Sequence, residues 1–116
     1  MPLVMHAAAL DANDLATSLL KPPAAEPLSG DILVRQRVLH RDGRIVTGTW
    51  ESDPGLSRWD FADHGEVIHI LSGRMIVSRD GGEAVELAAG ATAVFEPGWT
   101  GEWQVLETLR KVFMVY

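Results

Sequence analysis

The sequence contains no cysteine, which excludes disulfides, thiolate nucleophiles and thiolate zinc sites together. It also contains no block of lysine and arginine, and its formal net charge is -6 over 116 residues. A nucleic acid or an anionic membrane surface is therefore not expected as a partner, because no cationic patch could release counterions from phosphates. No apolar run approaches the roughly 20 residues that a membrane-spanning helix needs.

The start of the chain also lacks the marks of a secretory leader. It has no basic segment, and Asp11 and Asp14 interrupt the place where an apolar core should continue. We therefore interpret it as mature chain and expect a cytoplasmic protein. With 47% hydrophobic and 22% charged residues, the composition is that of one globular domain.

Turn residues divide the chain into two parts. "DANDLATSLL" begins with capping residues and has leucines at helical spacing, which predicts a short helix from about Asp14 to Leu20. "KPPAAEPLSGD" ends it with prolines and a glycine. From Asp31 onward, short β-prone runs alternate with turns, as in the predicted hairpin "MIVSRDGGEAVEL", which indicates an antiparallel sandwich or barrel.

The stretch "ADHGEVIHILSG" holds two histidines and a glutamate that could resemble a metal site. We interpret it as a strand closed by Gly73, and side chains on a strand alternate between two faces. His69 therefore cannot join His64 and Glu66 around one ion, and two ligands are fewer than a zinc or iron site needs. The two predicted faces are His64, Glu66, Ile68 and Ile70 on one side and Val67, His69 and Leu71 on the other.

Four stretches together resemble the cupin superfamily. "EVIHILSG" is similar to the end of the first cupin motif, and "GATAVFEPGW" to the second. The resemblance is closest to ureidoglycine aminohydrolase-type cupin domains, the third cupin subfamily, long a domain of unknown function (DUF861-like). The four stretches that carry it are "GTWESDPGLSRWDF", "EVIHILSG", "AGATAVFEPGWTGEWQVLE" and the terminal "TLRKVFMVY". The resemblance implies an all-β, RmlC-like jelly-roll β-barrel over residues 31–116, preceded by an irregular extension with a short helix over residues 1–30.

The usual metal ligands of that superfamily are largely missing. The His-x-His positions before Glu66 hold Trp59 and Phe61, or Asp60 and Ala62, and the histidine of the second motif is replaced by Gly101. Only Glu66 remains, with His64 as a weak further candidate. No cofactor and no metal site are expected, and a divalent metal is the minor alternative.

Aromatic residues and one pair of cations complete the predicted site. All four tryptophans, Trp50, Trp59, Trp99 and Trp103, lie in the barrel region, where they could simply be core. However, with Trp59 at a former ligand position and Trp103 on the same strand face as Gly101, the two rings would give an apolar pocket with one carboxylate. Neighbours on a strand face opposite ways, so one of Arg110 and Lys111 points inward; the resemblance favours Lys111, which could pair with Glu66 or hold an anionic group.

Two functions remain open. One is a small metabolic enzyme acting on a polar or anionic metabolite, with Glu66 and Lys111 as catalytic residues. The other is a non-catalytic ligand-binding or regulatory module that has lost metal chemistry. The candidate ligand-binding residues in either case are Trp50, Arg58, Trp59, Phe61 and Trp103. The partner is a small molecule, and the apolar outward residues of the first motif lead us to expect a homodimer.

Overall fold

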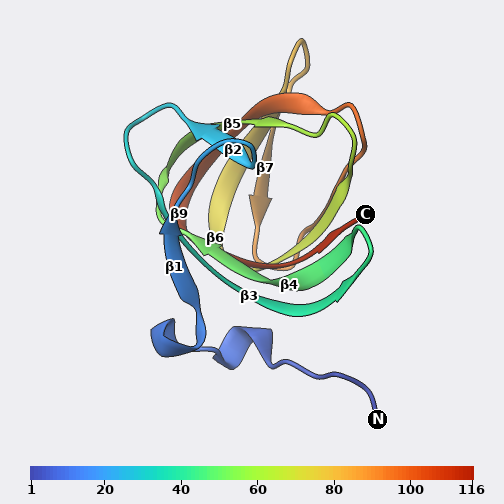
Figure 1. The fold of residues 1–116 in the computed structure, drawn as a ribbon. Coiled ribbons are helices and arrows are strands. Elements are labelled where there is room, and N and C mark those ends of the chain that lie inside the picture. Colours follow the sequence, from blue (N-terminus) through green and yellow to red (C-terminus); the bar gives the residue numbers. More distant parts are fainter.

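The computed structural model describes all 116 residues, and antiparallel β-strands form most of it (Figure 1). Two single-turn 3-10 helices come first. In chain order the elements are η1 (Ala7–Ala9), η2 (Ala12–Asp14), β1 (Ala16–Leu19), β2 (Ala25–Pro27), β3 (Leu33–Asp42), β4 (Ile45–Ser52), β5 (Gly55–Asp60), β6 (Glu66–Arg79), β7 (Ala84–Ala88), β8 (Thr92–Phe95) and β9 (Thr100–Val115).

One path of hydrogen-bonded neighbours runs β1-β3-β4-β9-β5-β2, and β6 joins it through β9 while also pairing with β7 and β8. The long strands β6 and β9 pair along most of their length. The first part of β9 also pairs with β5, and its last part with β4. This double use of β9 curls the sheet around an interior, seen end-on in Figure 1, and confirms the predicted all-β barrel.

The first-motif strand continues past the expected end. Gly73 was predicted to close it, yet β6 runs through to Arg79 with irregular register between Ile70 and Met75. Gly73 has a φ of 88°, and a Cβ there would overlap the carbonyl oxygen of Thr108. The glycine therefore permits a bulge and a close backbone approach inside one strand. The hairpin that follows is confirmed, with Met75 paired to Leu87.

The alternation predicted for this strand is also confirmed. Glu66, Ile68 and Ile70 are buried, whereas Val67 and His69 on the other face are half-buried. The inner face belongs to a core of 17 buried hydrophobic residues, in which Trp59 stacks on Trp103 with ring centroids 3.9 Å apart. The dimer expected from the outer face stays a prediction.

The predicted helix from about Asp14 to Leu20 is wrong. Asp11 does form a capping box with Asp14, but the helical turn ends there and residues 16–19 form β1. This strand pairs with β3, and Leu15 and Leu20 at its two ends are buried. Pairing with an existing strand satisfies the backbone and outweighs the local helical signal. The stretch expected to be an irregular extension thus contributes β1 and β2 to the sheet.

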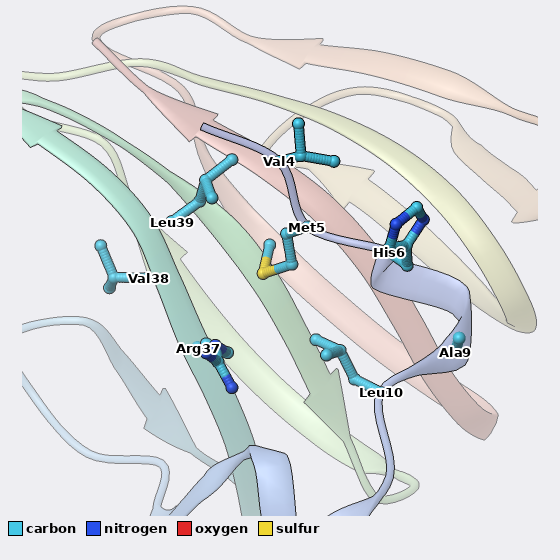
Figure 2. Close-up of a pocket in the computed structure, with 8 residues that line it drawn as sticks. All are labelled: Val4, Met5, His6, Ala9, Leu10, Arg37, Val38 and Leu39. Carbon is cyan, nitrogen blue, oxygen red and sulfur yellow. The ribbon is translucent and has the colours of Figure 1, made fainter. Parts of the chain in front are cut away.

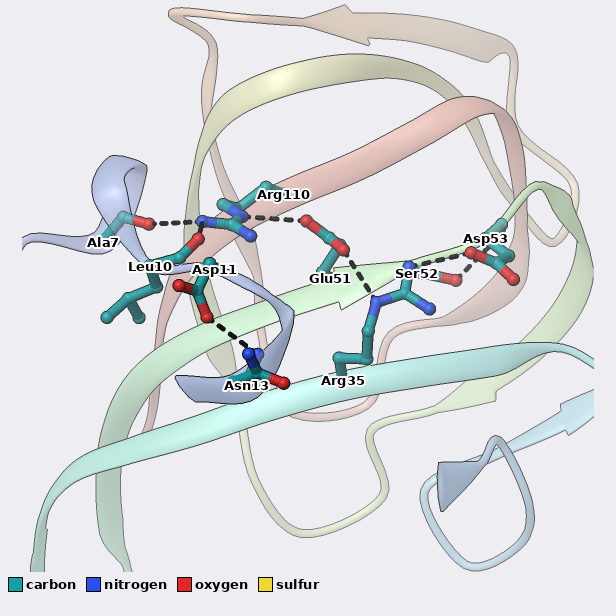
Figure 3. Close-up of polar contacts among 9 residues, drawn as sticks. All are labelled: Ala7, Leu10, Asp11, Asn13, Arg35, Glu51, Ser52, Asp53 and Arg110. Atoms are coloured by element: carbon teal, nitrogen blue, oxygen red, sulfur yellow. Dashed lines mark hydrogen bonds and ion pairs between the residues drawn. The ribbon is translucent and has the colours of Figure 1, made fainter. Parts of the chain in front are cut away.

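Residues 4–10 lie against β3 and β9. Between this N-terminal segment and β3 is a cavity of about 370 Å³, into which Met5 and Leu10 point (Figure 2). Arg110 of β9 holds the segment by donating hydrogen bonds to the carbonyl oxygens of Ala7 and Leu10, at 3.0 and 2.5 Å (Figure 3). The two 3-10 helices are the only helices, and neither has the length or the apolar character that a membrane span requires.

Candidate functional site

A second cavity, of about 180 Å³, opens on the inner face of the barrel. Its wall includes one cross-strand row, in which Gln36 of β3, Trp50 of β4 and Lys111 of β9 are successive partners. Residues of this row therefore point the same way. The full lining is Ala24, Gln36, Trp50, Trp59, His64, Glu66, Lys111, Phe113 and Val115.

The two charged residues of this cavity form a buried ion pair. Lys111 Nζ donates to Glu66 Oε2 at 2.5 Å, and the side chains are 2% and 8% exposed. Glu66 is the first residue of β6, and Lys111 lies near the end of β9. Their strands pair directly, which brings residues 45 positions apart into contact.

Three tryptophans surround the ammonium of Lys111. Its Nζ lies 4.4 Å from the ring centroid of Trp50, 4.5 Å from that of Trp103 and 5.7 Å from that of Trp59. A cation over the face of an aromatic ring is stabilised by the ring quadrupole, more so where water is excluded. The rings therefore support the charged form of a lysine that has almost no contact with solvent.

Burial and pairing act in opposite directions on this lysine. Burial lowers the pKa of Lys111 from its ordinary value, and the charge and hydrogen bond of Glu66 offset part of that decrease. Because a charged lysine and a charged glutamate neutralise each other, the site as a whole carries no net charge from this pair. The cavity is thus an apolar, aromatic space with one neutral ion pair in its wall.

The remaining candidates fall into two groups. Trp103 is fully buried behind the cavity, and Phe61 is 1% exposed and stacks on Trp59 at 5.9 Å. Both support the lining without belonging to it. Arg58 lies elsewhere: it is half-exposed and forms a bidentate pair with Asp80 at 3.0 and 2.5 Å. The structure does not bring Arg58 to the cavity.

His64, the weak metal candidate, has a side chain that is 37% exposed. It nevertheless lines the cavity and contacts the Phe61 ring edge-on at 5.4 Å. Four lining residues were not foreseen: Ala24, Gln36, Phe113 and Val115. The alternation along "KVFMVY" could have identified the last two, since they share the face of Lys111.

A metal ion, which the cupin resemblance implies, does not fit these residues. No group of three or more His, Asp or Glu side chains could hold one. Glu66 is already paired with Lys111, whose ammonium supplies a fixed positive charge beside it. At Gly101, where a histidine would be required, any Cβ would overlap the backbone oxygen of Ser78. A histidine there would require β6 and β9 to move apart.

Comparison with known families and structures agrees with this architecture. A model of the EutQ-like cupin domain family matches residues 39–113. That range contains most of the cavity lining, including Glu66 and Lys111. No curated protein matches the sequence.

Solved structures show the same fold. The EutQ protein of Clostridium difficile superposes with a TM-score of 0.64 at 18% identity, over 73% of this chain and 63% of that one. A DUF861 family protein of unknown function from Pseudomonas syringae pv. tomato gives 0.73 at 21% identity, over 88% and 44%. A DUF861 family protein from Thermotoga maritima gives 0.55 at 28%, over 59% and 76%. The chain spans less than two thirds of the first two proteins.

Proposed function

The chain belongs to the EutQ-like cupin domain family, and we propose that it binds a small polar metabolite in the barrel cavity walled by Trp50, Trp59 and the Glu66–Lys111 pair. The observation that carries this proposal is the buried ion pair at the cavity wall. Replacing such a pair by apolar residues of similar volume is often neutral or stabilising, so stability alone gives little reason to keep it. Charged groups in an aromatic cavity are typical of ligand sites.

The enzymatic version of this function assigns chemistry to Glu66. Its carboxylate lies at the cavity together with the imidazole of His64, so two groups able to transfer protons face the same space. Lys111 then holds Glu66 in place, and the tryptophans exclude water from the reacting groups. The reaction class would be proton transfer to or from the bound metabolite.

The second version is a non-catalytic binding or regulatory module. The observation that favours it is the short contact between Glu66 and Lys111, because the ammonium at 2.5 Å already occupies one oxygen of the carboxylate. Turnover separates the two versions. A bound metabolite that is recovered unchanged after prolonged incubation with the protein supports the binding module.

The cavity can be tested with one plugging variant. Ala24 is an exposed loop residue that lines the cavity, so Ala24→Trp should fill it without touching the ion pair. Ala84→Trp, on the exposed strand β7 away from the cavity, is the matched control. We expect metabolites that raise the melting temperature of the parent protein to do so for the control and not for Ala24→Trp. Equal stabilisation of both variants would place the ligand elsewhere.

We also propose that the purified protein carries no stoichiometric transition metal. The reason is the donor set: Glu66 is neutralised by Lys111, and His64 adds at most one further ligand where three are the practical minimum. Elemental analysis after dialysis measures this directly. About one zinc, manganese, iron or nickel ion per chain would refute it.

A further inference from the structure

The ammonium of Lys111 is poorly accessible for a hydrogen bond to a ligand. One of its three N–H groups points to Glu66 Oε2, and the ring centroids of Trp50 and Trp103 lie 4.4 and 4.5 Å from Nζ. The side chain is 2% exposed. Lys111 is therefore enclosed by one carboxylate and aromatic faces, and acts as a positioning residue for Glu66.

The second carboxylate oxygen of Glu66 is in a different situation. Oε2 accepts the hydrogen bond from Lys111, while Oε1 has no partner in the protein. Oε1 is also not sealed in, because the only buried side-chain nitrogen or oxygen atom without a partner is Nε1 of Trp103. Since Glu66 lines the cavity, Oε1 presents its free lone pairs there.

The charge of the cavity limits what Oε1 can meet. Glu66 and Lys111 cancel, and no other Asp, Glu, Lys or Arg lines the space. An anionic ligand would approach a carboxylate, and the imidazole of His64, the one further group able to carry a positive charge there, is already paired with Asp63 at 3.1 Å. A cationic ligand would approach a site where the neighbouring ammonium already neutralises that carboxylate. In both cases desolvation of the ligand charge is poorly compensated.

From these contacts we infer that the cavity selects an uncharged ligand group that donates an N–H or O–H hydrogen bond to Glu66 Oε1, with its apolar or planar part against Trp50 and Trp59. This inference rests on the proposed function and narrows it to a ligand class. The amide of Gln36, in register with Trp50 at the exposed edge of the site, is placed to accept or donate a second hydrogen bond. A primary carboxamide satisfies all of these conditions.

Three probes of one shape test the inference: benzamide, benzoate and benzamidine, which are neutral, anionic and cationic. Binding is measured by NMR titration, following the indole N–H signals of Trp50 and Trp59. We expect benzamide to bind at least about tenfold more tightly than either charged probe, because an uncompensated ligand charge costs more than one hydrogen bond contributes. The indole signals of the two cavity tryptophans should move together on titration.

A double variant checks that the ion pair is the cause. Glu66→Gln with Lys111→Met keeps shape and removes both charges, and its side-chain amide can donate as well as accept. We expect the preference for benzamide over benzoate to fall by at least about threefold in this variant, because the new side-chain amide can donate to the benzoate carboxylate while the desolvation cost of the ligand charge remains. Glu51→Gln with Arg110→Met, on the outer face, is the matched control and should retain the preference of the parent.

The outcomes are distinct. If benzoate or benzamidine shifts the same indole signals with equal or higher affinity in the parent, this inference is overturned and the cavity remains a ligand site. If no probe shifts them up to its solubility limit, both this inference and the proposed function fall. Should the double variant not fold, the comparison of the three probes in the parent alone decides the matter.

Discussion

Two neighbouring residues of β9 show how differently this barrel uses a cation on its two faces. Lys111 points inward and is the cross-strand partner of Trp50, whereas Arg110 points outward and is the partner of Glu51. Each forms an ion pair with a glutamate, at 2.5 Å inside and 2.9 Å outside. The two cations are adjacent in the sequence, but apart from the paired glutamate their surroundings differ.

On the outer face the hydrogen bonds are many. Glu51 accepts from Arg35 through one oxygen and from Arg110 through the other, at 2.7 and 2.9 Å (Figure 3). Burial would raise the pKa of Glu51, but the two guanidinium groups outweigh it and hold that pKa below its ordinary value. Both oxygens of this carboxylate have partners, so it has no role left except to join β3, β4 and β9.

The contrast shows why a lysine stands inside and an arginine outside. A guanidinium has five donors in a fixed fork, which suits a cluster that must satisfy a carboxylate and two backbone carbonyls at once. An ammonium is compact and fits among three aromatic rings with one carboxylate oxygen. The inner pair therefore leaves one acceptor open to the cavity, and the outer cluster leaves none.

The largest effect is expected from breaking the inner pair. Lys111→Met keeps the volume but leaves Glu66 buried beside tryptophans without a partner, which should lower the free energy of unfolding by about 3 kcal/mol. Urea denaturation at neutral pH measures it. Adding Glu66→Gln removes the stranded charge, so the double variant should return to within about 1 kcal/mol of the parent. A loss under 1 kcal/mol in the single variant would mean that water reaches Glu66 freely.

Breaking the outer cluster of Arg35, Glu51 and Arg110 should lower the free energy of unfolding by less, and it should affect the N-terminal segment instead of the cavity. Arg110→Met releases the carbonyls of Ala7 and Leu10, while Glu51 keeps Arg35. We expect a loss of about 1 to 2 kcal/mol in the free energy of unfolding, the range for hydrogen bonds to a charged group at a half-buried site. Amide hydrogen exchange should become faster at residues 1–15, and this increase should be larger than the increase at any residue of β6.

Unchanged exchange in that segment would show that packing around Met5, and not Arg110, fastens it. Arg35→Met is the matched variant, because it removes the other guanidinium bound to Glu51 and leaves both carbonyl bonds of Arg110 in place. It should lower stability to a similar degree while leaving exchange at residues 1–10 as in the parent.

Much of the inner face could be predicted from the sequence. Alternation alone separated Glu66 from His69, and it required that Arg110 and Lys111 face opposite ways. Alternation did not decide which of the two points inward, because each of them shares its own face of the strand with apolar residues. The structure decides this through the register of β9 with β4 and β6, which pairs Lys111 with Trp50 and Ile70.

Other parts could not be predicted from local pattern. Gln36 enters the site only because β3 pairs with β4 in one particular register, and Ala24 because the segment before β2 lies at the cavity. Such long-range contacts leave no signal at short range. The same applies to β1, whose helical spacing was overridden by pairing with β3. Arg58 resembles a site residue in sequence, but its strand parity and Asp80 hold it outside.

The pair formed by Arg58 and Asp80 extends the comparison to a third environment, in which both side chains are close to half-exposed, at 41% and 49%. Hydrogen bonds from Arg58 and Thr100 lower the pKa of Asp80 to about 2, from an ordinary value of 3.8. Because the folded-state pKa is the lower one, this contribution to stability is complete above about pH 4. It disappears as the pH falls through about 2.

This exposed pair should give the smallest effect of the three. In Arg58→Met the pKa of Asp80 should rise toward 3.8, with the hydroxyl of Thr100 still holding it slightly below that value. A carboxyl carbon NMR titration of parent and variant measures both midpoints. Melting temperatures should differ little at neutral pH, since water already solvates an exposed pair well. If the variant loses as much stability as Lys111→Met does, then burial does not determine how much stability is lost when each of these ion pairs is broken. The contrast between the two faces of β9 must then have another cause.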